Sequence, residues 1–218
     1  MSRSSKYTFR TQHDNQMSAL ARMLGDGTQS GSSACYLLTL TFDRYYDRYM
    51  ISAPSERAVT RADVLGGLTC KMPPAAAVDL RLALIRRFYV RFCRKLLGRD
   101  WARLRNVQPR GIGWLDAPVA KTARKLSPLA RLPGDVFDHA HIVLAIPTLV
   151  LPGRNSSVQE RFEELSALGQ IQHIWRGLQN EGEAHIVPAP IIHGALHYSA
   201  KTAKRLHAFH DHMIILPD

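Results

Sequence analysis

The sequence predicts a single α+β domain in which helices flank a central, largely antiparallel sheet. A length of 218 residues, with 45% hydrophobic and 22% charged residues, suits one buried core and argues against a disordered chain or a membrane protein. Two apolar runs, 35–42 and 137–146, are rich in β-branched and aromatic residues and are typical of buried strands. Segments with helical periodicity are interspersed with them, and this mixed order favours helices packed on a sheet.

The N-terminal part of the chain predicts a helix, a flexible link and a strand. Residues 12–24 are the helix candidate, and the Gly- and Ser-rich residues 25–33 form the link that leads to the strand at 35–42. We therefore expect residues 1–33 to form an N-terminal arm with its link. Residues 34–218 are expected to form the main domain.

A long helix is predicted over residues 76–97. Leu84 and Phe88 belong to an apolar series with helical spacing, and Gly98 is a stop signal. One side of this helix is expected to pack on the core while the other carries many arginines. Residues 101–108, which follow it, predict another strand.

The second half of the chain begins with a Pro- and Lys-rich loop over 117–134. The strand at 137–146 follows and is closed by Pro147. Ser157 and Glu160 then have the spacing of a capping box, which opens a helix. The remaining expected elements are that helix, a strand and a final helix: 157–180, 184–192 and 196–210.

Charge is the compositional feature that points to a partner. The chain has 29 Lys and Arg against 18 Asp and Glu, a net charge of +11, which predicts an anionic partner and most often nucleic acid. Within residues 81–110, Asp100 is the only acidic residue among ten basic ones, whereas a solvated face designed for solubility mixes both signs. We expect the following residues to contact phosphates: Arg86, Arg87, Arg91, Arg94, Lys95, Lys204 and Arg205.

The cysteines and the apolar runs indicate a cytoplasmic protein with no membrane partner. Cys35, Cys70 and Cys93 are odd in number and widely spaced, so they are expected to be reduced thiols. The apolar run 142–151 is too short for a spanning helix and is broken by Pro147. The first residues lack the apolar stretch of a secretory signal.

Two histidines on the strand at 137–146 are candidate metal ligands. His139 and His141 are two residues apart, so in a strand both imidazoles project from the same face and are close enough to share a divalent ion such as Mn²⁺. A carboxylate or amide from a neighbouring strand could complete the set. Because the chain has ten histidines, such a triplet also arises by chance, and a second pair occurs at His210 and His212. We interpret that second pair either as a decoy, which matches the metal motif without binding a metal, or as a helix end that contacts phosphate.

A tyrosine near the C-terminal helix is a candidate nucleophile. Tyr198 and Lys201 are three residues apart and lie on one face of the predicted helix. A phenol ionises near pH ~10, so a nearby ammonium or metal is needed to favour the phenolate. Lys201 could do that, neutralise a pentacovalent phosphate, or protonate the leaving group. The alternative is an amphipathic helix whose tyrosine fills the core.

Taken together, these motifs resemble those of the rolling-circle replication initiators. The run LLTLTF at 37–42 is similar to their first-strand motif, and His139-Ala-His141 is similar to their HUH metal motif (histidine, hydrophobic residue, histidine). The segment that begins at Tyr198 and ends at Lys201 resembles their single catalytic tyrosine with its companion lysine. The three motifs occur in the order that the family uses. Within that family, the chain resembles the replication endonucleases of filamentous phages and the related plasmid or prophage proteins.

The resemblance implies a metal-dependent enzyme that nicks and rejoins single-stranded DNA at a specific sequence or hairpin. Residues 34–218 would be the HUH catalytic domain, with Mg²⁺ or Mn²⁺ held by His139 and His141. Tyr198 would attack the scissile phosphate and form a covalent 5′-phosphotyrosine with a free 3′-hydroxyl. Rolling-circle replication of a phage, plasmid or related element would begin at that nick.

The resemblance also implies a third polar ligand on the strand beside the histidines. Gln108 takes that position on the predicted strand, with Asp116 and Asp138 as alternatives. No phosphate-binding GxxxxGK[ST] loop occurs in the chain, so a separate host helicase and polymerase are expected as partners.

Three other functions fit part of the pattern. A non-catalytic basic protein that binds nucleic acid would explain the charge. A metal phosphoesterase would use water in place of Tyr198. The same nicking chemistry could also serve transposition or conjugative transfer.

Overall fold

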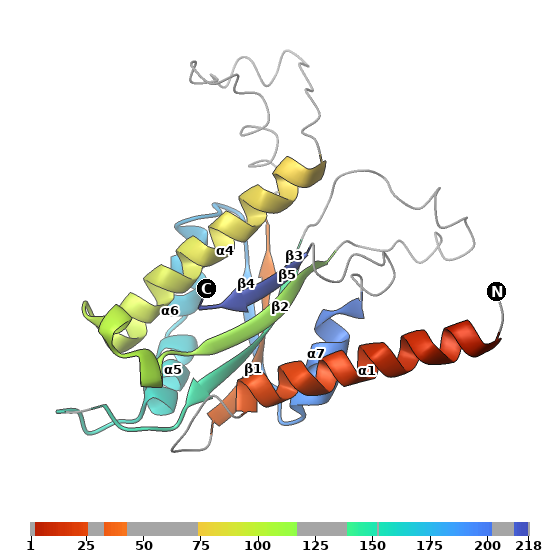
Figure 1. Cartoon of the computed structure of the whole chain (residues 1–218). Coiled ribbons are helices and arrows are strands. Elements are labelled where there is room, and N and C mark those ends of the chain that lie inside the picture. The colour runs from red at the N-terminus through yellow and green to blue at the C-terminus, as the bar shows by residue number, and fades with distance from the viewer. Residues whose placement is uncertain are drawn as a thin grey trace, which may run out of the picture.

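The computed structural model describes residues 3–25, 33–42, 74–116, 139–151, 153–201 and 212–217. In this part of the chain, five strands form one sheet with the order β4-β1-β3-β2-β5, in which all neighbours are antiparallel (Figure 1). The strands are β1 (Ser33–Thr41), β2 (Arg110–Asp116), β3 (His139–Pro147), β4 (Ala184–Pro188) and β5 (Met213–Leu216). Helices and an antiparallel sheet are thus combined as expected for the predicted α+β class.

The helices of the described residues form a layer on each face of the sheet. They are α1 (Arg3–Gly25), α4 (Pro74–Leu97), α5 (Val158–Ala167), α6 (Gln170–Arg176) and α7 (Ile192–Ser199), with two short 3₁₀ turns, η1 (Trp101–Arg103) and η2 (Arg105–Val107). From β1 to β4 the order is βαββαβ, which places β1 and β3 in the middle. After β4, α7 and β5 are added, and β5 pairs with β2 at the edge.

The larger core lies between one face of the sheet and α4, α5 and α6. Leu38 on β1 and Ile142 on β3 are buried there, together with their neighbours two residues along each strand. The helices contribute a group of aromatic rings, in which Phe88 and Phe92 stack and Trp175 meets Phe88 edge-on. These large apolar side chains account for the periodicity that predicts α4 from the sequence.

The opposite face of the sheet is covered in part by α1 and α7 (Figure 1). Trp114 on β2 and Val143 on β3 are fully buried there, against Met17 of α1 and Leu196 of α7. The strand side chains on this face alternate with those in the larger core, as the two-residue period of a strand requires. The division of the chain at residue 33 stays a prediction, although Met17 is buried with this second cluster.

Residues 101–108, expected to be a strand, instead form the turns η1 and η2. Trp101 meets Tyr89 of α4 edge-on, and the Tyr89 hydroxyl donates a hydrogen bond of 2.6 Å to the carbonyl oxygen of Pro109. These contacts hold the turns against the end of α4, so the strand begins only at Arg110. A tryptophan packed on the preceding helix thus overrides the local strand preference of the segment.

Other boundaries differ because single residues end an element. The helix expected over 157–180 is divided into α5 and α6 at Gly169, whose φ of 65° lies in the left-handed region that glycine adopts readily. The capping box at its start is confirmed, because Ser157 and Glu160 each accept a hydrogen bond from the other's backbone nitrogen. The chain leaves β4 at Pro188, and α7 begins at Ile192, four residues before its expected start. None of the described helices is both long enough and apolar enough to cross a lipid bilayer.

Candidate metal and tyrosine site

The pairing of β2 with β3 brings an aspartate next to the two predicted histidines. Asp116, the last residue of β2, is the Cα partner of His139, and Trp114 is the partner of His141. Residues 114, 116, 139 and 141 therefore project from the same face of the sheet, the one that α7 covers. The strands thus bring together two imidazoles and one carboxylate.

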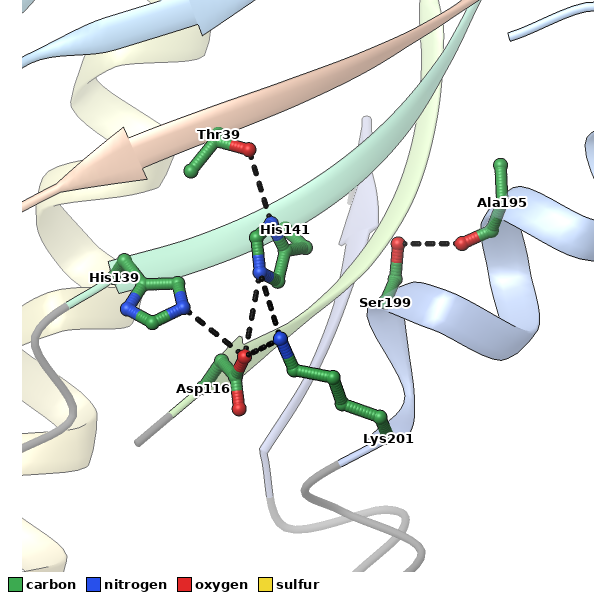
Figure 2. A network of polar contacts seen from close by, with 7 residues as sticks. All are labelled: Thr39, Asp116, His139, His141, Ala195, Ser199 and Lys201. Atoms are coloured by element: carbon green, nitrogen blue, oxygen red, sulfur yellow. Dashed lines mark hydrogen bonds and ion pairs between the residues drawn. The ribbon is translucent and has the colours of Figure 1, made fainter. Parts of the chain in front are cut away.

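The three side chains point toward one another (Figure 2). The Asp116 Oδ2 atom lies 3.0 Å from His139 Nε2 and 3.3 Å from His141 Nε2. One ligand atom from each residue falls within 4.8 Å of the others, which is a spacing that suits a shared metal ion. These residues could therefore hold a divalent metal, as the sequence predicts for the histidines.

Thr39 on β1 orients the ring of His141 from the opposite side. It is the Cα partner of His141, and its Oγ1 atom lies 3.0 Å from His141 Nδ1 (Figure 2). With Nε2–H donating to Asp116, Nδ1 accepts a hydrogen bond from the Thr39 hydroxyl. The other tautomer, in which Nδ1–H donates to Thr39, would leave the lone pair of Nε2 for a metal. Thr39 therefore acts as an outer partner that fixes the ring of a ligand.

The electrostatics of the cluster favour the protonation states that metal ligands need. Burial raises the pKa of Asp116, but hydrogen bonds from His139, His141 and Lys201 outweigh it and hold that pKa well below its usual range. Burial lowers the pKa of His141, and the hydrogen bond to Asp116 opposes this shift only in part. The carboxyl is therefore ionised and the imidazole of His141 is neutral near pH ~7.

Helix α7 brings the predicted tyrosine to the cluster. Its buried residues Leu196 and Ser199 fix the helix against the sheet, and Tyr198 projects beside them with 47% of its surface exposed. The ring centroids of Tyr198 and His141 are 4.8 Å apart. A solvent-accessible phenol therefore lies directly next to a candidate metal ligand.

Lys201 connects the tyrosine with the aspartate. Its Nζ atom lies 2.7 Å from Asp116 Oδ2, 3.5 Å from His141 Nε2 and 4.5 Å from the centroid of the Tyr198 ring. The lysine side chain is one-third exposed while Asp116 is 1% exposed, so the ammonium reaches the carboxylate from the solvent side. One cation thus contacts both the phenol ring and the candidate metal ligands.

Gln108, the residue expected as third ligand, is not brought to the histidines. It lies before β2, at the end opposite Asp116, and its Nε2 atom donates to the carbonyl oxygen of Trp101 at 2.9 Å. It lines a cavity of about 540 Å³ between the end of α1, the 3₁₀ turns and β5. Asp116, one of the two alternatives, takes the place beside the histidines. The other alternative, Asp138, lies outside the described residues.

The predicted phosphate-binding residues are divided between a described helix and an undescribed segment. Those on α4 are all exposed: Arg86, Arg87, Arg91, Arg94 and Lys95. This helix belongs to the layer on the sheet face opposite Tyr198 (Figure 1). Lys204 and Arg205 lie outside the described residues, as does His210 of the second histidine pair.

Thr39 was not predicted as a site residue, although it lies inside the first-strand motif. The alternation of side chains along β1 is the signal that could have predicted this role for Thr39. Leu38 and Leu40 are buried in the larger core, so the polar residue between them has to face the opposite side of the sheet, where the histidines lie.

Comparisons with known proteins identified no relative. No protein-family model matches the chain, and comparison with curated proteins and with solved structures gave no match either.

Proposed function

We propose that the protein is a metal-dependent endonuclease that nicks and rejoins single-stranded DNA through a covalent phosphotyrosine at Tyr198. The observation that carries the proposal is the position of the Tyr198 ring, 4.8 Å from the ring of His141 in the Asp116–His139–His141 cluster. Three segments that are distant in the sequence meet here: the end of β2, the start of β3 and the end of α7. These segments carry the histidine and tyrosine motifs that resemble those of the replication initiators, and the motifs occur in the same order along the chain.

The donor set fits the divalent metal that this chemistry uses. Two imidazoles and a carboxylate suit Mn²⁺ and also accept Mg²⁺, and three protein donors leave further positions for phosphate oxygens. A metal held by Asp116, His139 and His141 would supply Lewis-acid polarisation of the scissile phosphate. Burial of Asp116 and His141 keeps the donors in place before any substrate arrives.

The remaining work belongs to Tyr198 and Lys201. The phenol oxygen attacks phosphorus, the bond to the 3′ oxygen breaks, and the 5′ phosphate stays on the tyrosine. The phenol loses one proton and the 3′ oxygen gains one. The ammonium of Lys201, 4.5 Å from the centroid of the Tyr198 ring, stabilises the negative charge that develops on the reacting phosphate in the transition state. Because the phosphoester energy is stored in the new bond, the strand can be rejoined by the reverse step.

Such an enzyme would act on single-stranded or hairpin DNA and would depend on a separate helicase and polymerase. The net charge of +11 supports a polyanionic substrate. The same reaction would serve replication of a phage or plasmid, and equally transposition or conjugative transfer. A non-catalytic binding protein would explain the charge but would leave the cluster without a role.

The test is formation of a covalent adduct. The protein is incubated in Mn²⁺ with a random-sequence pool of single-stranded oligonucleotides labelled at the 3′ end, and is then resolved on a denaturing gel. The label should move with the protein, because the fragment that keeps the 3′ end also carries the 5′-phosphotyrosine. EDTA and Tyr198→Phe should each abolish the adduct.

Tyr36→Phe is the matched control, because it removes a hydroxyl that bonds to Glu163 on the other side of the sheet. This variant should form the adduct at the wild-type level. Cleavage in Mn²⁺ without an adduct, unchanged in Tyr198→Phe, would replace the proposal with a phosphoesterase that uses water. Binding without cleavage would leave a non-catalytic protein.

A further inference from the structure

The exposed side of α4 carries an unusual concentration of positive charge. Arg87, Arg91 and Arg94 are spaced i, i+4 and i+7, so they lie on one face of the helix over about 10 Å, and Lys95 lies next to them. We call these four residues the basic ridge. All four are exposed. Arg91 also donates a hydrogen bond of 3.3 Å to the carbonyl oxygen of Gly177, which joins the ridge to the end of α6.

The basic ridge and the tyrosine site face opposite directions. The side of α4 opposite the ridge is buried with β1 and β3 in the larger core, whereas Tyr198 and the histidines lie on the other face of the same sheet (Figure 1). The full thickness of the sheet and of a helix therefore separates the two surfaces. A single strand seated at Tyr198 does not reach the ridge without passing around the edge of the domain.

No acidic side chain neutralises the basic ridge within the described residues. The ion pairs found there involve Asp14 and Asp116, and no carboxylate lies within ion-pair distance of a ridge residue. Four exposed like charges on about two turns of helix repel one another, which costs stability unless a polyanion neutralises them. This pattern fits a surface that binds a row of phosphates.

The ridge also lacks the aromatic side chains on which unstacked bases rest. The aromatic residues of α4 in its C-terminal half, Phe88, Tyr89 and Phe92, are at most 3% exposed. Proteins that bind single strands combine cations with exposed aromatic rings, whereas contacts to the phosphates of a duplex need no stacking side chain. On the tyrosine face, by contrast, Tyr198 is half-exposed.

We propose that the basic ridge binds the phosphate backbone of duplex DNA, at a site separate from the one that cuts the single strand. The choice of DNA rests on the proposed function, but the preference for a duplex rests on the ridge itself. One molecule would thus hold a double-stranded segment on α4 and a single strand at Tyr198. Hairpin or partly melted DNA has both parts.

The test compares two charge-matched double variants. Arg87→Gln/Arg94→Gln removes two ridge cations and leaves Arg91, whose side chain also bonds to α6. Arg22→Gln/Arg105→Gln makes the same change in net charge at exposed positions near the end of α1 and in η2. Duplex affinity is measured by fluorescence anisotropy over a range of salt concentrations. All samples contain EDTA, so the result does not depend on the metal cluster or on the adduct.

The slope of log affinity against log salt concentration is negative. For the ridge variant its magnitude should decrease by about 1.8, since each of the two lost phosphate contacts contributes about 0.9. The control variant should change the slope by much less. Unfolding temperatures confirm that both variants fold. Equal effects in both variants would show that only net charge matters, and no effect in either would show that the ridge does not contact the duplex. Either result overturns the proposal. Duplex binding by the ridge is measured separately from adduct formation, so failure to observe the adduct would not change the interpretation of this experiment.

Discussion

Removing the ammonium of Lys201 should strengthen metal binding while it weakens the reaction. The Nζ atom lies 2.7 Å from the same Asp116 oxygen that contacts both histidines, so the lysine and a divalent metal compete for one carboxylate. A hydrogen bond between charged groups contributes about 1.5–3 kcal/mol. Because the Lys201 side chain is one-third exposed, we take the lower end of that range. The variant Lys201→Met should then bind Mn²⁺ about tenfold more tightly, since about 1.4 kcal/mol corresponds to a factor of ten.

The assay is calorimetric titration of Mn²⁺ into each protein. Lys95→Met, on the opposite face of the sheet, is the matched control and should bind Mn²⁺ like the wild-type protein. Adduct formation by Lys201→Met should be slower, because the reacting phosphate loses a cation that lies 4.5 Å from the centroid of the Tyr198 ring. If Lys201→Met binds Mn²⁺ no more tightly than the wild-type protein does, the carboxylate is not shared and the reasoning is refuted.

Three further predictions test how the cluster is assembled. Thr39→Val keeps the shape of the side chain but removes the hydroxyl near His141 Nδ1. Mn²⁺ affinity in the same titration should therefore fall about 10–100-fold. An unchanged affinity would show that Thr39 does not act as an outer partner of His141. Asp116→Asn should abolish measurable Mn²⁺ binding while Gln108→Ala leaves it intact, and the reverse outcome would restore Gln108 as the third ligand. Gly113→Ala should lower the unfolding temperature strongly, because a Cβ there overlaps the backbone oxygen of His141 on the neighbouring strand. A wild-type melting curve for Gly113→Ala would contradict the observed pairing of β2 with β3.

Much of this architecture was predictable, because its main elements are long and strongly patterned. The aromatic and aliphatic residues that bury α4 recur every third or fourth position, and β3 is a run of apolar residues that ends at a proline. The common face of His139 and His141 follows from the two-residue period of any strand. The sequence spacing also predicts that Tyr198 and Lys201 lie close together, and they do, although α7 ends at Ser199 and Lys201 follows it.

Which residue stands beside the two histidines as the third candidate ligand could not be predicted, because it depends on strand register. Register is set where the chain leaves the turns after α4, and there the packing of Trp101 on Tyr89 decides the start of β2. A strand beginning earlier would have favoured Gln108, whereas the strand that starts at Arg110 ends with Asp116 next to His139. Local composition does not encode that tertiary contact.

The sequence also does not predict which face of the sheet α4 covers. The pattern of α4 shows that one side is buried and the other is basic, but an amphipathic helix packs on either face of a sheet with the same periodicity. The face is decided by the βαββαβ connections, which put α4 with α5 and α6. Only the structure separates the arginines of α4 from Tyr198.

The placement of the phenol on a helix that follows the βαββαβ unit affects when the protein can act during its own synthesis. The ribosome releases the three residues of the cluster first and Tyr198 well after them. At about 5–20 residues per second, the interval from His141 to Tyr198 is roughly 3–11 s. During that time a nascent chain holds the three cluster residues but not the phenol, so any reaction that needs both has to wait until the last part of the chain has been made.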